Sequence, residues 1–183
     1  MKEDTVTRRV ISAAMVSAFV GLGAYAGAFQ DSRSGPSHVK GDLDGYQENP
    51  SISTTGRGTV DLRIDEEAQA IDFEVTYSGL EGTATVSHIH FARERVNGPV
   101  VVFFCGGGGK GPCPPEGTVT GTITASDIPD PATPAPGSAA ANGLNTFEEL
   151  VRAIRAGATY ANVHSSKWPG GEIRGQIPVA DER

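Results

Sequence analysis

The sequence has no long run of basic residues. Its 15 Lys and Arg residues are outnumbered by 22 Asp and Glu residues, which gives a formal net charge of −7. This balance argues against nucleic acid or an anionic membrane surface as a partner. The sequence also lacks the G-x-S-x-G motif of serine hydrolases. Its glycine run at 106–109 follows a cysteine rather than opening a phosphate-binding helix.

Hydrophobic residues are also few, at 38%, whereas glycine and proline are frequent, with 24 and 12 residues. This composition favours a turn-rich all-β domain over a helical one. The 183 residues are enough for one domain with a hydrophobic core.

The sequence contains only two cysteines, Cys105 and Cys113, on either side of a glycine-rich loop. Such a loop is flexible enough to let the sulfur atoms meet, and an even number of cysteines at short spacing favours a disulfide in an oxidising compartment. Metal ligation by the pair is the alternative, but their spacing is unlike that of zinc-binding cysteines. We therefore predict a Cys105–Cys113 disulfide.

The N-terminal segment has the features of an export signal. Lys2, Arg8 and Arg9 precede an uncharged stretch, 10–28, that ends in small residues around Ala24 and Ala26. This order predicts a signal peptide over residues 1–26 and a secreted or periplasmic, that is extracytoplasmic, protein. The alternative is an uncleaved anchor, since the stretch approaches the roughly 20 residues that a membrane span needs. Only an anchor would make the membrane a partner.

Residues 27–39 show no periodicity and predict a flexible segment, which is followed by a single domain over 40–178 and a tail over 179–183. Apolar residues alternate with polar ones over 58–64 and again over 71–77, which predicts a β-hairpin. Further strands are expected over 39–48, 84–91, 100–104, 117–124, 158–164 and 172–178.

One helix is predicted over about residues 146–156. Thr146 and Glu149 have the spacing of a capping box, and apolar residues follow at i, i+3, i+4 and i+7 from Phe147. Together the elements predict an antiparallel, Greek-key-like β-sandwich or flattened barrel of about eight strands with one short helix.

Two of the four histidines, His88 and His90, lie two residues apart in a strand-like run, so their side chains share a face. A third, His164, lies in a similar run. Two imidazoles at i and i+2 and one from another strand can form a three-histidine metal site. The alternative is a hydrogen-bonded polar network at the sheet edge.

Five ordered segments resemble the CHRD domain, which is repeated in chordin and occurs singly in many secreted bacterial proteins. The segments are 45–50 (GYQENP), 87–90 (SHIH), 97–100 (NGPV), 156–164 (AGATYANVH) and 169–176 (PGGEIRGQ). The resemblance spans about residues 40–178. In chordin such domains belong to an extracellular growth-factor antagonist, and little chemistry is assigned to the bacterial single-domain members.

A looser similarity is to copper-zinc superoxide dismutase, a Greek-key sandwich whose copper lies on a His-x-His strand and on further histidines. It implies copper ligation by His88, His90 and His164. Arg174 is assigned the attraction of the superoxide anion on its charge alone, because no motif of that family matches it. Only His38 remains, in the predicted flexible segment, so the implied enzyme is copper-only.

From these observations we expect a binding module rather than an enzyme, with an extracellular protein or a small ligand as its partner. If a metal binds, ligation by imidazoles alone suits copper or zinc better than magnesium or calcium. Asn162, Glu172 and Arg174 are then the residues expected to support the ligand rings. The copper-only oxidoreductase remains the alternative.

Overall fold

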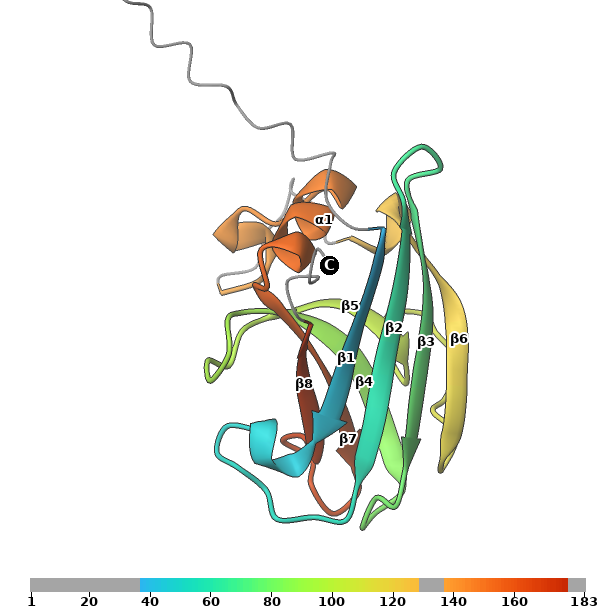
Figure 1. Cartoon of the computed structure of the whole chain (residues 1–183), viewed down its shortest axis with the longest axis vertical. Coiled ribbons are helices and arrows are strands. Elements are labelled where there is room, and N and C mark those ends of the chain that lie inside the picture. Colours follow the sequence, from blue (N-terminus) through green and yellow to red (C-terminus); the bar gives the residue numbers. More distant parts are fainter. Residues whose placement is uncertain (1–36, 129–136, 178–183) are drawn as a thin grey trace, which may run out of the picture. The chain divides into compact units, whose positions relative to one another are not determined.

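The structure, a computed structural model, describes residues 37–128 and 137–177. Eight strands form one antiparallel sheet that is nearly closed into a barrel, in the order β5-β4-β7-β8-β1-β2-β3-β6 (Figure 1). The predicted all-β architecture of eight strands and one helix is confirmed, in its flattened-barrel form. Within the described residues, no helix has the length and apolar character needed to cross a membrane.

The strands follow the predicted segments closely. They are β1 (His38–Asp44), β2 (Arg57–Asp65), β3 (Ala70–Ser78), β4 (Ala84–Phe91), β5 (Val100–Cys105), β6 (Gly117–Thr124), β7 (Thr159–Ser165) and β8 (Ile173–Ile177). The helix is α1 (Phe147–Arg155), and short 3-10 turns are η2 (Gly45–Gln47), η3 (Ala125–Asp127) and η4 (Ala140–Asn142).

The first strand differs from its prediction at its C-terminal end. It stops at Asp44 rather than Glu48 because the Asp44 carboxylate caps the η2 turn: Oδ1 accepts hydrogen bonds from the backbone N–H groups of Tyr46, at 2.8 Å, and Gln47, at 3.1 Å. His38 lies in β1 and not in a flexible segment, with Nε2 2.7 Å from an oxygen of Asp61 on β2.

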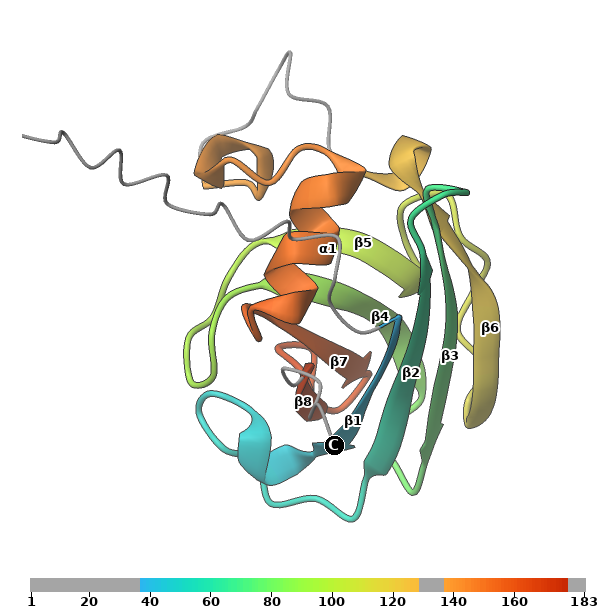
Figure 2. The same cartoon turned by 45° about the horizontal axis from the view of Figure 1, so that its top comes forward.

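The apolar core lies on one face of the sheet and extends to the helix. On β2 and β3 the buried residues alternate with exposed ones, as a half-buried antiparallel sheet requires. The apolar side chains of α1 belong to the same core, and α1 lies across one end of the barrel (Figure 2). The capping box is confirmed, since Thr146 Oγ1 accepts from Glu149 N and Glu149 Oε2 accepts from Thr146 N.

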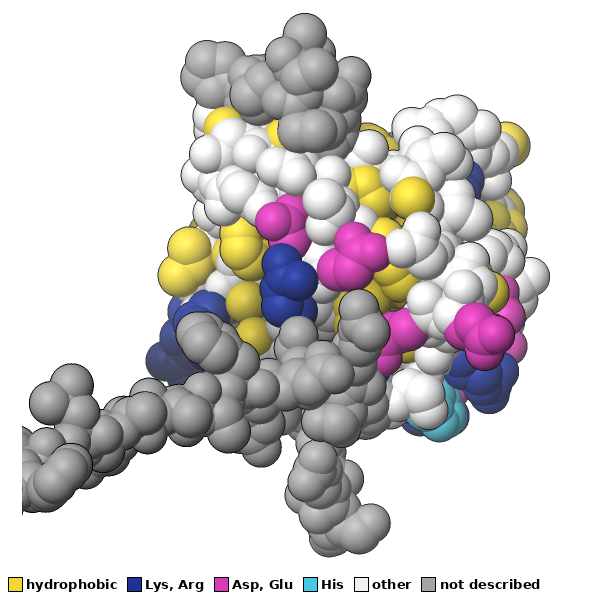
Figure 3. Space-filling view, turned by 90° about the horizontal axis from the view of Figure 1, so that it is seen from above, with side chains coloured by type: hydrophobic (Ala, Val, Ile, Leu, Met, Phe, Trp, Pro, Cys, Tyr) yellow, Lys and Arg dark blue, Asp and Glu magenta, His cyan; other side chains and the backbone are white. Residues whose placement is uncertain are grey.

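The predicted disulfide is confirmed between Cys105 at the end of β5 and Cys113 in the loop that leads to β6. Because β5 and β6 are the two edge strands, the bridge shortens the connection between them. On the surface, acidic and basic side chains lie close together in the view from above (Figure 3). Among the described residues, Arg155 and Glu66 form an ion pair at 2.7 Å. The predicted signal peptide and C-terminal tail lie outside the described residues.

Candidate metal centre

Three neighbouring strands carry polar side chains in register on one face. His88 on β4 pairs with Asn162 on β7, which pairs with Arg174 on β8. In the next row, His90 pairs with Tyr160. Because residues i and i+2 of a strand share a face, these five side chains point to the same side of the sheet. The intervening residues belong to the apolar core on the opposite face: Ile89, Ala161, Val163 and Ile173.

His164 completes a cluster with His88 and His90. It lies two residues beyond Asn162 on β7 and therefore on the same face. One ring nitrogen from each histidine lies within 4.8 Å of the others. The ring centroid of His88 is 4.5 Å from that of His90 and 4.8 Å from that of His164. His88 and His90 are only 5% and 9% exposed, whereas His164 is half-buried.

Backbone carbonyl groups orient two of the three rings. His90 Nδ1 is 2.7 Å from the carbonyl oxygen of Gly98 in the β4–β5 loop. His164 Nδ1 is 2.8 Å from the carbonyl oxygen of Pro169 in the β7–β8 turn. A carbonyl oxygen can only accept, so in both rings Nδ1 carries the proton and Nε2 keeps its lone pair.

The other ring nitrogens give the strongest indication of a metal site. His90 Nε2 and His88 Nδ1 are buried and have no hydrogen-bond partner among the described residues. His164 Nε2 accepts a hydrogen bond of 2.9 Å from Asn162 Nδ2. Buried nitrogens normally have a partner, so two unpartnered ones in one cluster indicate that the cluster is incomplete by itself.

All three histidines are held in the neutral form. Burial, reinforced by the neighbouring His90 and His164 rings, lowers the pKa of His88 to about 3. Burial likewise lowers the pKa of His90 to about 4, against the opposing effect of its hydrogen bond to Gly98. Burial also lowers the pKa of His164. Neutral imidazole is the form that binds metals, so these rings need not lose a proton at neutral pH.

Tyr160 and Arg174 form two further layers above His90. The Tyr160 ring is stacked on His90, with centroids 4.5 Å apart and 6° between the planes, and the Arg174 guanidinium lies 3.4 Å from the Tyr160 centroid. Arg174 is 1% exposed and donates hydrogen bonds to three acceptors of the β4–β5 loop: Asn97 Oδ1, Arg93 O and Val96 O. Its contacts indicate that Arg174 positions this loop and the ring beneath it.

Of the residues expected to support the rings, Asn162 contacts His164 directly. Glu172 is fully buried, but its Oε1 accepts from Thr54 Oγ1 and from the backbone N–H of Glu81, each at 2.6 Å. Its other oxygen has no hydrogen-bond partner among the described residues. Glu172 therefore fastens two loops, and its hydrogen bonds do not reach the histidines.

The geometry fits a small cation that prefers nitrogen ligands. Ligand nitrogens of a tetrahedral ion at about 2.1 Å stand roughly 3.4 Å apart, so ring nitrogens up to 4.8 Å apart need to approach by up to about 1.4 Å. The donor set contains imidazole only, which suits copper or zinc. In addition, two of the rings already donate their other N–H to a carbonyl oxygen, the arrangement that usually orients metal-binding histidines.

Comparison with protein-family models matches residues 39–177 to the CHRD domain. The chain belongs to the CHRD domain family. A search of curated proteins and a search of solved structures found no match. The resemblance of the five sequence segments to the CHRD domain is therefore confirmed.

In this CHRD domain, the sequence did not reveal every residue around the histidines. The Tyr160 ring was missed, although it lies on the same face as Asn162 and His164 at a spacing of two, which was a usable signal. The carbonyl groups of Gly98 and Pro169 could not have been found in this way. Any residue offers a carbonyl, so these partners appear only when the loops are folded.

Proposed function

We propose that this CHRD domain is an exported, non-catalytic binding module that holds one copper or zinc ion on His88, His90 and His164. The observation that carries the proposal is the pair of buried, unpartnered ring nitrogens, His88 Nδ1 and His90 Nε2, in a cluster whose ligand atoms lie within 4.8 Å of one another. A cation bound between the rings supplies the missing partner for both.

The alternative of a purely structural polar network explains these nitrogens less well. A network that serves stability alone is expected to satisfy its own buried groups, because each unpartnered group costs about 1–3 kcal/mol. Of His88 Nδ1, His90 Nε2 and His164 Nε2, only the last has a hydrogen-bond partner in the described part of the chain, Asn162. Metal binding at this nitrogen breaks that one hydrogen bond, so the Asn162 amide must turn away.

The contacts of Arg174 favour a binding module over a superoxide dismutase-like oxidoreductase. An arginine that attracts an anion from solvent needs an accessible guanidinium group, whereas Arg174 is 1% exposed and its N–H groups are bound to the β4–β5 loop. The disulfide supports export, since such bonds persist mainly in oxidising compartments.

Elemental analysis of the purified protein, after loading with copper or zinc and dialysis, tests the proposal. We expect about one equivalent of metal in the wild type and none above background in the His88→Ala/His90→Ala/His164→Ala variant. His38→Ala is the matched control, because it removes a histidine outside the cluster, and it should keep its metal. Equal metal in the wild type and the triple variant contradicts the proposal. If copper binds, a superoxide assay on the loaded protein decides between binding module and oxidoreductase.

Export is tested separately. Mass spectrometry of the protein recovered from the extracytoplasmic fraction should show a mature chain that begins shortly after Ala26. Full-length chain in the membrane fraction indicates an anchor, and full-length chain in the cytoplasm contradicts export.

A further inference from the structure

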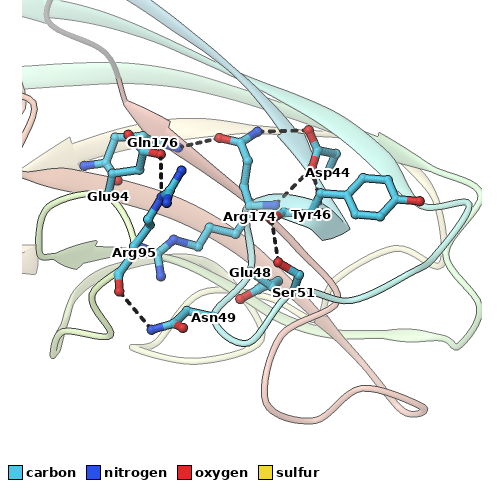
Figure 4. A pocket seen from close by; sticks show the side chains of 10 residues that line it. Asp44, Tyr46, Glu48, Asn49, Ser51, Glu94, Arg95, Arg174 and Gln176 are labelled. Atoms are coloured by element: carbon cyan, nitrogen blue, oxygen red, sulfur yellow. Dashed lines mark hydrogen bonds and ion pairs between the residues drawn. The ribbon is translucent and has the colours of Figure 1, made fainter.

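Glu48 is a buried acidic residue next to the turn that holds His164. It is 8% exposed and belongs to the lining of a polar pocket of about 510 Å³ between the loop after β1, the β4–β5 loop and β8 (Figure 4). Its Oε1 lies against Gly171, where a Cβ atom would clash with it. Gly171 belongs to the same β7–β8 turn as Pro169, whose carbonyl group orients His164. The Glu48 carboxyl group is therefore packed beside the histidine cluster.

The loop that carries Glu48 is fixed by its neighbour. Asn49 Nδ2 donates to Arg95 O, and Asn97 Nδ2 donates to Asn49 O, each at 2.9 Å. Figure 4 shows the first of these bonds. A group on a fixed loop needs little further ordering to hold a partner. Glu48 is thus preorganised for a contact with the strands behind it.

The side chain of Asn162 joins Glu48 to His164. Asn162 is 3% exposed, and its Nδ2 donates to His164 Nε2 at 2.9 Å. Burial raises the pKa of Glu48 to about 7, against the effects of the Arg174 charge, of the next backbone N–H and of a hydrogen bond from the Asn162 side chain. A carboxylate only accepts, so the Asn162 NH₂ group is the donor to it. One amide group therefore serves two acceptors, the Glu48 carboxyl group and the His164 ring.

A metal bound to His164 disturbs this arrangement. It uses the lone pair of His164 Nε2 that now accepts from Asn162, so this hydrogen bond must break. The amide is buried and needs an acceptor that it can keep, because an unpartnered buried donor is costly. Glu48 is already in contact with it, and a carboxylate is a stronger acceptor than a neutral ring nitrogen.

We propose that Glu48 is a positioning residue of the metal centre, which draws the Asn162 amide away from His164 Nε2 when a metal binds. This inference rests on the proposed metal site and adds a control to it. Asn162 competes with the metal for His164 Nε2, and Glu48 competes with His164 for the Asn162 amide. A purely structural acid lacks the resulting signature: removal of the carboxylate weakens metal binding only while the amide is present.

Zinc affinities of the wild type, two single variants and their double variant test this signature. They are measured by competition with a chromophoric chelator at a pH above the pKa of Glu48. Glu48→Gln keeps the shape of the side chain and should weaken zinc binding about tenfold, because a neutral acceptor holds the amide less strongly. Asn162→Leu has a similar branched shape without N–H and should bind zinc roughly threefold more tightly than the wild type.

The double variant decides the pathway. Glu48→Gln/Asn162→Leu should bind zinc as Asn162→Leu does. An equal loss on Glu48→Gln in both backgrounds shows that Glu48 acts through its charge alone and overturns the proposal. Glu74→Gln removes a carboxylate from the exposed face of β3 and is the matched control, with unchanged affinity.

Glu48→Asp covers the case in which Glu48→Gln does not fold. It keeps the charge but shortens the side chain by one methylene, so its carboxylate no longer reaches the amide. Zinc binding should again be weakened severalfold, and only while Asn162 is present. An affinity equal to that of the wild type contradicts the positioning role.

NMR of the metal-free protein separates this inference from the metal site itself. With a chelator present, the ¹⁵N signals of the Asn162 side chain and of the His164 ring report their hydrogen bond. In Glu48→Gln the His164 Nε2 signal should move further toward the hydrogen-bonded position, and in Asn162→Leu it should move toward the free position. Unchanged signals in Glu48→Gln overturn the inference even if metal binds. A wild type that takes up neither zinc nor copper contradicts the proposed function, whereas the metal-free shifts confirm or overturn the link between Glu48 and the amide on their own.

Discussion

The two halves of the barrel-like sheet differ in how their two faces are buried. In the scaffold half (β1, β2, β3 and β6), buried and exposed residues alternate along β2 and β3, so one face meets the core and the other meets solvent. In the histidine half (β4, β5, β7 and β8), both faces of the two inner strands β7 and β8 are covered. Every residue of β7 is buried except the half-buried His164, and every residue of β8 except Gln176.

The difference lies in what covers the second face. In the histidine half the covering layer consists of loops, which provide the carbonyl groups of Gly98 and Pro169 and the acceptors of Arg174. This layer encloses histidines that a half-buried sheet would leave in water. Most buried polar groups in proteins have a hydrogen-bond partner. Buried polar side chains that lack one are therefore expected mainly at functional sites. The scaffold half shows the same sheet without a layer of loops that buries polar side chains.

The largest expected effect concerns pH. Between the lowered pKa values of His88 and His90, about 3 and 4, and the ordinary value of 6.5, the unfolded chain binds more protons than the folded one. Stability of the metal-free protein therefore falls as pH decreases, by about 2 kcal/mol for each histidine between pH 7 and pH 5. Urea unfolding at both pH values, compared with a His88→Gln/His90→Gln variant, should show that the variant lacks this loss.

Glu48 changes the pH dependence of stability in the opposite direction to the histidines, which provides a control. Its pKa is raised to about 7, so between 4.5 and 7 the folded protein binds the extra proton and gains stability as pH decreases. Glu48→Gln should therefore make the acid destabilisation steeper, by about 2 kcal/mol between pH 7 and pH 5. If the dependence of stability on pH is the same in the wild type, in His88→Gln/His90→Gln and in Glu48→Gln, these groups are not buried in the neutral form.

A matched pair of core substitutions sharpens the comparison between the halves. Leu62 on β2 and Ile89 on β4 are both fully buried, and truncation of either to alanine should lower the free energy of unfolding by about 3 kcal/mol. Only Ile89→Ala should also weaken metal binding, because the packing of Ile89 in the core fixes the part of β4 that carries His88 and His90. Denaturant unfolding and metal titration of both variants measure this. Equal loss of metal affinity in Leu62→Ala contradicts a local site.

Removal of the disulfide is expected to have a smaller effect. The bridge closes a loop with a sequence separation of 8, which corresponds to about 2.5 kcal/mol in the chain-entropy account. The Cys105→Ser/Cys113→Ser variant should unfold at a lower denaturant concentration by that amount and still bind metal. Loss of the metal in a folded variant instead shows that the edge strand β5 helps to position His88.

The smallest effect is expected at the helix cap, far along the chain from the histidine strand β4. Thr146→Ala removes the hydroxyl that accepts from Glu149 N, and about 1 kcal/mol of stability should be lost. Thr146→Ser keeps a hydroxyl and should behave nearly as the wild type. Thermal unfolding of the two variants separates the loss of the cap from any change in packing.

The sequence predicted local elements well for physical reasons that act over few residues. Alternation over 58–64 and 71–77 predicted β2 and β3, and the Thr146–Glu149 spacing predicted the start of α1. The spacing of His88 and His90 predicted a shared face. The participation of His164 was predicted from its similar strand-like run and from the looser similarity to copper-zinc superoxide dismutase, because no local pattern states which strands are neighbours.

Other features could not be predicted because they arise between distant segments. The strand order places β8 between β7 and β1, which decides what Arg174 contacts. The contacts of Arg174 with the loop carbonyl groups of Arg93 and Val96 and with the Tyr160 ring follow from this order, and its charge alone does not reveal them. The end of β1 at Asp44, rather than at the expected Glu48, is set by the Asp44 side chain that caps η2.

The most direct test of the central claim is a count of imidazole ligands on the bound ion. Pulsed electron paramagnetic resonance of the protein loaded with one equivalent of Cu(II) detects the remote nitrogen of each coordinated imidazole. We predict three coordinated imidazoles in the wild type and in His38→Ala, and two in each single variant His88→Ala, His90→Ala and His164→Ala. A signal from one imidazole or none, or the same signal in the wild type and in all three single variants, contradicts the three-histidine site.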